Sequence, residues 1–106
     1  MATYLVLNKL TEQGAKNIRN LPQITQGIRA DIEGRGGKLH GMYLTQGRYD
    51  TALLVEMPDE HEFVAGLLGA VSLGAIHSET LRAYNEEEVQ QIVQKISSGP
   101  AIPHQQ

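Results

Sequence analysis

The stretch that most restricts the fold of this chain is residues 38–56, KLHGMYLTQGRYDTALLVE. Two runs rich in Leu, Val and Tyr flank a turn centred on Gln46-Gly47-Arg48. Such runs, joined by a short turn that contains glycine, predict a β-hairpin. Any architecture for the chain must therefore be built around two adjacent antiparallel strands.

The segments before the hairpin alternate between strand and helix patterns. Residues 3–10 include a run of apolar, β-tolerant residues, which predicts a strand at the centre of a sheet, covered on both faces. Thr11 is placed to cap a short helix, and Pro22 to open a longer one. The apolar stripe predicted for this longer helix consists of Leu21, Ile24, Ile28 and Ile32.

A second long helix is predicted after the hairpin, where Asp59 and Glu62 have the spacing of a capping box. Gly66 and Gly69 destabilise a helix relative to alanine. We therefore expect these two glycines to mark a close approach of the helix to the sheet or to a second copy of the chain.

The last part of the chain has a strand pattern over residues 76–84 and a further capping pair at Asn85 and Glu88. The terminal helix that follows has an apolar stripe consisting of Val89, Ile92, Val93 and Ile96. Residues 97–106 contain Gly and two prolines without periodicity, which predicts a mobile C-terminal tail. We expect one domain over residues 1–96, followed by this tail.

The order of these elements predicts an α+β fold of the ferredoxin-like type, βαββαβ, with a four-stranded antiparallel sheet plus a C-terminal helix. Both long helices would cover the same face of the sheet. The hairpin is apolar on both faces, and a large exposed apolar sheet is an aggregation hazard. We therefore expect a second subunit to cover the other face, in a homodimer or a higher homo-oligomer.

Composition narrows the partners and the chemistry. The net charge is −3, and the 9 Lys and Arg residues are scattered, which disfavours nucleic acid as a partner. The absence of Cys excludes a thiolate nucleophile and a Cys-ligated metal. The N-terminal apolar run is too short for a secretory signal and no membrane association is indicated, so the expected location is cytoplasmic.

The residues Gly47-Arg48-Tyr49-Asp50 lie in a chain that resembles the GYD-domain family over residues 2–95. The resemblance also rests on the opening ATYLVL, on GGKLHGMYLTQGRYD and on SLGAIHSETLRAY. It implies a ferredoxin-like member of the dimeric α+β barrel group, in which two sheets pack face to face. That wider group includes haem-handling oxygenases, isomerases and ligand-sensing domains, so the resemblance implies a fold and a dimer but no particular reaction.

His77 and Glu79 are the candidate catalytic residues. They are two apart on the last predicted strand and so point to the same face, where they could act as a general acid/base pair or as metal ligands. The alternative is a strand decorated with solvated polar groups. His40 is the only further candidate metal ligand, so we predict no metal site, and the sequence identifies no cofactor.

The candidate ligand-binding residues are His40, Tyr43, Arg48, Tyr49 and Asp50. Gly41 leaves room beside the Tyr43 ring, either for a ligand or for packing against a second subunit. Arg48 could bind a carboxylate or a phosphate, or it could pair with Asp50. Tyr49 and Asp50 could equally serve to fix the turn, with Asp50 accepting backbone N–H bonds.

Three functions remain open at this stage. The first is a homo-oligomeric module that binds a small apolar ligand or regulates a partner, with a pocket between packed sheets lined by Tyr43, His77 and Glu79. The second is a dimeric-barrel enzyme, an isomerase or a cofactor-poor monooxygenase, that uses His77 as base and Glu79 to orient it. The third is a structural assembly subunit or a partner-docking domain.

Overall fold

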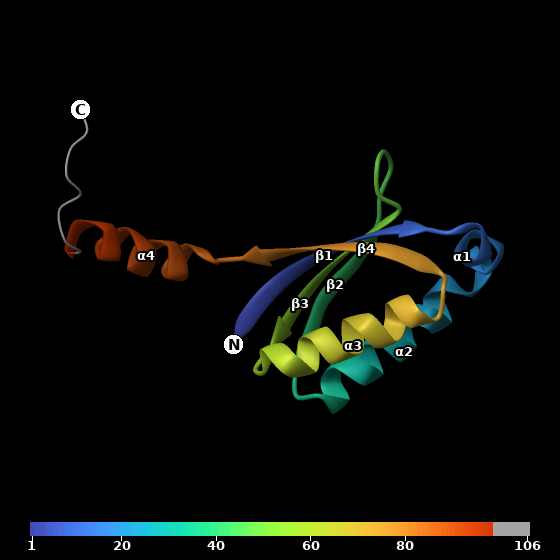
Figure 1. Ribbon diagram of the computed structural model, residues 1–106, viewed down its shortest axis with the longest axis horizontal. Coiled ribbons are helices and arrows are strands. Elements are labelled where there is room, and N and C mark those ends of the chain that lie inside the picture. The colour runs from blue at the N-terminus through green and yellow to red at the C-terminus, as the bar shows by residue number, and fades with distance from the viewer. Residues whose placement is uncertain (99–106) are drawn as a thin grey trace.

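The computed structural model describes residues 1–98. In chain order its elements are β1 (Ala2–Leu10), α1 (Glu12–Lys16), the 3-10 turn η1 (Ile18–Asn20), α2 (Leu21–Gly34), β2 (Lys38–Leu44), β3 (Thr51–Met57), α3 (Glu60–Ser72), β4 (Ile76–Ala83) and α4 (Glu86–Ser98). The strands form one antiparallel sheet in the order β2-β3-β1-β4 (Figure 1). This is the ferredoxin-like arrangement that the sequence predicts.

The helices α2 and α3 lie on one face of the sheet, which we call the helix face (Figure 1). Alternate residues of a strand point to the same side, so each central strand sends every second residue under the helices. The buried apolar residues of this core are Tyr4, Val6, Ile32, Leu39, Leu53, Val55, Met57 and Phe63. Tyr4 and Phe63 stack with their ring centroids 3.9 Å apart, which joins β1 to α3.

The opposite side of the sheet, the open face, has no helix over it (Figure 1). Its residues are those that alternate with the core positions and pair across the strands: Leu5, Leu7, Lys9, Gly41, Tyr43, Ala52, Leu54, Glu56, His77, Glu79 and Leu81. β1 is the central strand that the sequence predicts, but only its helix face is fully covered. Leu5 and Leu7 on the open face are only half-buried.

The hairpin between β2 and β3 contains an irregularity that determines which side chains reach the core. The register shifts between Leu39 and Gly41, so His40 is the extra residue of a β-bulge. Leu39 is thereby buried on the helix face, and Gly41 pairs with Leu54 on the open face. Gly47 in the connecting loop has a φ of 105°, a conformation that L side chains rarely adopt.

The predicted helix starts are confirmed. The Thr11 side chain accepts a hydrogen bond from Gly14 N, and Asp59 Oδ1 accepts one from His61 N. Asn85 and Glu88 form a reciprocal capping box: Asn85 Oδ1 accepts from Glu88 N, and Glu88 Oε1 accepts from Asn85 N. Glu62 differs from the prediction, because its Oε1 accepts from Arg35 Nη1 at 2.8 Å and so connects α3 to α2.

The expectation that the glycines of α3 mark a close approach to the sheet is wrong, while their contact with a second copy of the chain stays a prediction. A Cβ atom at Gly66 would meet side chains of α2, namely Arg35 Nε and Asp31 Oδ2 at 3.3 Å, and not the sheet. A Cβ atom at Gly69 would meet nothing within 4 Å. The close approach to the sheet occurs elsewhere, at Gly37, where a Cβ atom would lie 2.5 Å from Glu56 O and against Met57 Sδ.

The terminal helix α4 extends away from the rest of the molecule as a continuation of the line of β4 (Figure 1). It runs through Ser98, two residues beyond the domain boundary that the sequence predicts. The remaining part of the predicted mobile tail, residues 99–106, lies outside the described residues.

Candidate functional site

The polar residues predicted to carry function gather mainly on the open face and on the loop that rises from it, residues 45–50 (Figure 1). Tyr49 extends from this loop and its hydroxyl donates a hydrogen bond to Glu79 Oε1 on the edge strand β4. The bond joins two segments that are separated by 30 residues in the chain. Glu79 is therefore bound by Tyr49, and no hydrogen bond joins it to His77 among the described residues.

Asp50 fixes the base of the same loop. Its Oδ2 accepts a hydrogen bond from Leu10 N at 2.8 Å, and its own N–H donates to Asn8 O at 2.8 Å. Its carbonyl accepts from Thr45 N at 2.8 Å. The Asp50 carboxylate thus binds a backbone N–H group, as one of the two sequence interpretations requires, and the group it holds belongs to β1.

Arg48 does not pair with Asp50. Its guanidinium carbon lies 5.5 Å from the centroid of the Tyr49 ring, within the range of a cation–π interaction. Arg48 is exposed near the tip of the loop. The side chains of Arg48, Tyr49 and Glu79 therefore form a chain of contacts from the loop to β4.

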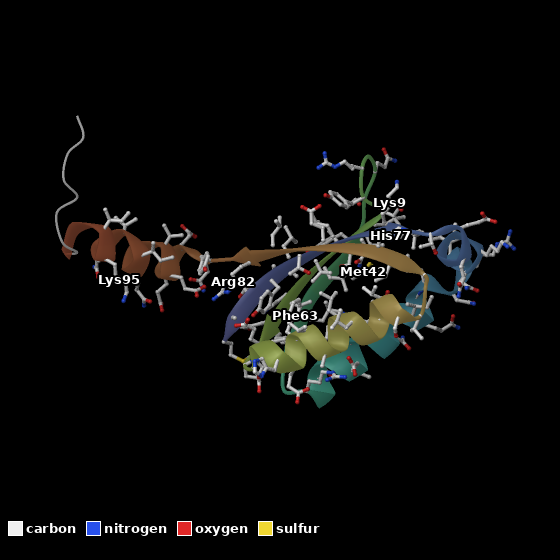
Figure 2. All side chains as sticks on the ribbon, in the orientation of Figure 1. Lys9, Met42, Phe63, His77, Arg82 and Lys95 are labelled. Atoms are coloured by element: carbon white, nitrogen blue, oxygen red, sulfur yellow. The ribbon has the colours of Figure 1, made fainter. Side chains whose placement is uncertain are left out.

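His77 is exposed on the open face, where it pairs in register with Lys9 of β1. Figure 2 shows Lys9 on the side of the sheet from which the loop rises, and Met42 and Phe63 on the side of the helices. His77 and Glu79 share this face, since they are two residues apart on one strand, with Cα atoms about 7 Å apart. The predicted pair is thus on one surface, but among the described residues no hydrogen bond or ion pair joins its members.

Tyr43 lies on the opposite edge of the sheet, on β2. Its side chain folds back over Gly41, because a Cβ atom built at Gly41 would lie 2.9 Å from the Tyr43 hydroxyl. Tyr43 is 61% exposed. Three inter-strand spacings separate β2 from β4, about 14 Å, so Tyr43 and His77 of one chain cannot line the same small pocket.

His40, at the bulge, forms a separate pair on the β2 edge. Its Nε2 is 2.9 Å from Glu56 Oε1 on β3, and both side chains are about one-third exposed, at 36% and 30%. The pair is distant from His77, since β2 and β4 are the two edges of the sheet. Within residues 1–98 no group of three or more His, Cys, Asp or Glu residues is arranged to hold a metal ion.

The helix α4 presents an exposed apolar stripe and extends away from the rest of the described chain (Figure 1). Its exposed residues are Val89, Ile92, Val93 and Ile96, with exposures between 42% and 75%. The direction of the helix is fixed at its start, where the Arg82 guanidinium lies 4.3 Å from the Tyr84 ring centroid and Arg82 Nη2 lies 3.6 Å from Glu88 Oε2. A capped helix with an exposed stripe at spacings i, i+3, i+4 and i+7 is typical of a segment that docks in a groove.

One residue of interest is not found by the sequence reasoning. Asn8 is only 6% exposed on the helix face of β1, and its Oδ1 has no hydrogen-bond partner among residues 1–98. The signal in the sequence is a single polar residue at an inward position of the apolar run ATYLVLNKL, in step with Tyr4 and Val6. Buried polar atoms are nearly always hydrogen-bonded, so an unpartnered one suggests a missing partner.

Comparison with known proteins identifies relatives of this chain. The model of the GYD domain matches residues 4–93. A Thermus thermophilus protein named glutamine synthetase and cystathionine beta-lyase binding protein is 29% identical over 84 residues, which covers 78% of this chain and 88% of that protein.

A crystal structure of TTHA0845, also from Thermus thermophilus, has a TM-score of 0.50 and 24% identity to this chain. The match covers 80% of this chain and 95% of that one. It supports the ferredoxin-like fold. None of the helices in residues 1–98 is long and apolar enough to cross a membrane.

Proposed function

Because this chain belongs to the GYD domain family, we propose that it is a homo-oligomeric binding module that regulates another protein. The observation that carries the proposal is the presence of two unpartnered apolar surfaces in one small chain: the open face of the sheet, and the stripe of α4. Exposed apolar patches of this kind mark surfaces that another molecule covers. The relative named as an enzyme-binding protein supports a binding role.

In the proposed assembly, a second copy covers the open face. The surface is self-complementary in character, with leucine and tyrosine side chains at its centre and edges, which suits a two-fold contact between identical faces. The arrangement is the sheet-to-sheet pairing of dimeric α+β barrels. Tyr49, Glu79 and His77 would then form a polar patch at the interface.

The size of the surface indicates that α4 joins the same contact. Four strands of about seven residues present about 23 by 19 Å of flat surface, or about 440 Å². A stable interface buries about 800 Å² of accessible surface on each partner. The apolar side of α4 is about 20 Å long and 10 Å wide, and adds about 200 Å², which brings the total to about 640 Å² and closer to that size. α4 continues the line of β4 beyond the sheet (Figure 1), so in the proposed assembly its stripe extends the contact made by the open face.

A pocket between the paired sheets would draw on both copies. Tyr43 on β2 and His77 on β4 are too far apart in one chain to share a small ligand. A two-fold axis that lies between the two sheets and runs parallel to the strands would bring the Tyr43 edge of one copy over the His77 edge of the other. The ligand-binding residues proposed from the sequence would then act across the interface.

The assembly is tested by light scattering of the purified chain over a range of concentrations. We expect a dimer or a larger species, and we expect Leu54→Lys and Ile92→Lys to reduce its mass, because each places a charge in a buried apolar contact. The matched controls are Ala30→Lys on α2 and Gln91→Lys on α4, both exposed away from the proposed contact. A monomer at every concentration would refute the assembly.

The regulatory role is tested by biolayer interferometry with the immobilised chain and, in turn, glutamine synthetase and cystathionine beta-lyase from the same cells. We expect saturable binding of at least one enzyme, with a change in its activity on addition of the chain. Retention of assembly by a chain that binds neither enzyme would favour a purely structural subunit and contradict regulation of these two enzymes.

A further inference from the structure

A large space lies on the helix face, between the sheet and the two helices α2 and α3. It has a volume of about 410 Å³ and adjoins a second space of about 400 Å³. Residues that line both spaces include Asn8, Ile24, Ile28, Leu53, Ala70 and Ile76. The space is partly open to solvent, so it is a pocket that a molecule can enter and not an enclosed packing defect. It is in the range of small-molecule sites.

The sequence keeps this space open. Gly27 of α2 and Gly66 and Gly69 of α3 all line it. A Cβ atom at Gly27 or Gly69 would meet no atom within 4 Å, so neither glycine is required by a close contact. Glycine destabilises a helix interior relative to alanine, and neither position has a positive φ. The helices are thus less stable with glycine than they would be with alanine at the positions where a side chain would narrow the cavity.

The floor of the cavity contains one polar anchor. Asn8 lines both spaces, is more than nine-tenths buried, and its Oδ1 accepts no hydrogen bond. Its register partner Ser78 on β4, and Thr80 two residues on, also have buried hydroxyl oxygens without a partner. A buried acceptor loses its bond to water on folding and regains it only when a donor reaches it. A bound molecule with a hydroxyl or N–H group would supply that donor.

Charges at the rim of the cavity disfavour an anionic ligand. Arg35 Nε lies 3.1 Å from Asp31 Oδ2, and Arg35 Nη1 lies 2.8 Å from Glu62 Oε1. These hydrogen bonds raise the pKa of the Arg35 guanidinium above its ordinary value, so it stays protonated and engaged. Two carboxylates against one cation leave a local excess of negative charge. The remaining lining is almost entirely apolar.

We propose that this cavity binds a small, neutral, mainly apolar molecule that donates a hydrogen bond from a hydroxyl or N–H group to Asn8 Oδ1. The site lies on the opposite side of the sheet from the surface assigned to assembly. It therefore differs from the pocket between sheets that the sequence suggests, and it stands independently of the oligomeric state.

The test uses two probes of nearly equal shape, 2-naphthol and 2-methylnaphthalene, of which only the first has a donor. Each is titrated into the isotopically labelled full chain, and binding is followed by NMR chemical-shift changes. We expect 2-naphthol to bind about tenfold more tightly, with the largest shifts at Asn8, Ile28 and Leu53, because one net hydrogen bond to a buried acceptor accounts for a factor of that order.

Two kinds of variant test the hydrogen-bond acceptor and the volume of the cavity separately. Asn8→Leu should bind both probes equally, since it removes the acceptor and keeps an apolar floor. Gly69→Phe and Gly27→Leu should weaken both probes together, and a spectrum unchanged on the open face shows that each variant is folded. Absence of binding by either probe, equal binding to the unaltered chain, or shifts confined to the open face would each overturn the proposal.

The same experiment keeps this site distinct from the proposed assembly. The mass of Asn8→Leu and Gly69→Phe measured by light scattering should equal that of the unaltered chain. A variant that loses both probe binding and assembly would overturn the independence of the two faces.

Discussion

The two faces of the sheet are built from the same strands, but helices cover only one of them. On β1, Tyr4 and Val6 are buried beneath the helices, while Leu5 and Leu7 point the other way and are half-buried. β3 shows the same alternation, with buried residues on the helix face and half-buried residues on the open face. The apolar character of the strands is thus similar on both sides, and only the cover differs. Both faces of the sheet are apolar, but the chain supplies helices for only one of them. The other face is therefore a surface for another molecule to cover.

The largest expected effect comes from truncating a leucine on each face. Leu39 is 2% exposed on the helix face, and Leu39→Ala should lower the free energy of unfolding by about 3 kcal/mol, from lost burial and the cavity that remains. Leu81 is 45% exposed on the open face, and Leu81→Ala should cost less than about 1 kcal/mol in the monomer. Urea denaturation at low protein concentration measures both.

Raising the protein concentration then sharpens the comparison. Assembly stabilises the folded state by mass action, so the cost of Leu81→Ala should grow with concentration while that of Leu39→Ala stays constant. Equal costs for the two variants at low concentration would show that the faces do not differ as described.

A smaller effect is expected from replacing either of two glycines with alanine: Gly37, which lies just before β2, and Gly41, which lies on the open face of β2. Gly37→Ala places Cβ 2.5 Å from the Glu56 carbonyl oxygen, a backbone atom, and should cost about 2 kcal/mol through overpacking. Gly41→Ala meets the Tyr43 hydroxyl, the end of a flexible side chain that is free to turn away, and should cost about 0.5 kcal/mol or less. Thermal unfolding of the two variants measures the difference, and a larger loss for Gly41→Ala would contradict it.

The smallest effect concerns the loop over the open face. Tyr49→Phe removes the hydroxyl that binds Glu79, a contact between partly exposed groups, and should cost about 0.5 kcal/mol. Glu79→Gln keeps an acceptor for the Tyr49 hydroxyl and serves as the control. Hydrogen exchange of residues 45–50 should rise in Tyr49→Phe, while exchange of the core strands stays unchanged. Increased exchange in Glu79→Gln alone would contradict the assigned bond.

Much of the fold follows from local patterns that the sequence displays. The hairpin and the capping residues Thr11, Asp59 and Asn85 depend on contacts within a few residues of each other. The family resemblance and the ferredoxin-like fold predicted from the order of the elements are confirmed. Such features are encoded by residue type at fixed spacing, which is why reading the chain in order finds them.

The features that escaped prediction depend on contacts between distant segments. Gly14 looks like a weak helix residue in the sequence, yet a Cβ atom there would collide with the carbonyl oxygen of Ala75. Asp50 binds the backbone of Leu10, forty residues earlier. Asn8 acquires its significance only when α2 and α3 enclose it. The contact partners of these residues have no local signal, because each contact requires the tertiary arrangement to bring the two groups together, although the inward position of Asn8 can be read from the strand pattern.

In the candidate site, too, some features follow from local spacing and others depend on contacts between distant segments. The alternation of a strand places His77 and Glu79 on one face, as predicted, but the choice of Tyr49 as the partner of Glu79 depends on the height and direction of a loop. The separation of Tyr43 from His77 depends on the strand order, which places β2 and β4 at opposite edges. Spacing along a chain reports the face of a residue and not its neighbour.

The central position of β1 also has a consequence for the order of events during synthesis. β1 leaves the ribosome before both of its neighbours, β3 and β4, and its two edges find partners only after Thr51 and Ile76 have been added. At about 5–20 residues per second, β4 follows β1 by on the order of several seconds. During that interval an apolar strand with two unpaired edges is exposed, so a strand that lies between two neighbours in the finished protein is one that needs protection while the protein is being made.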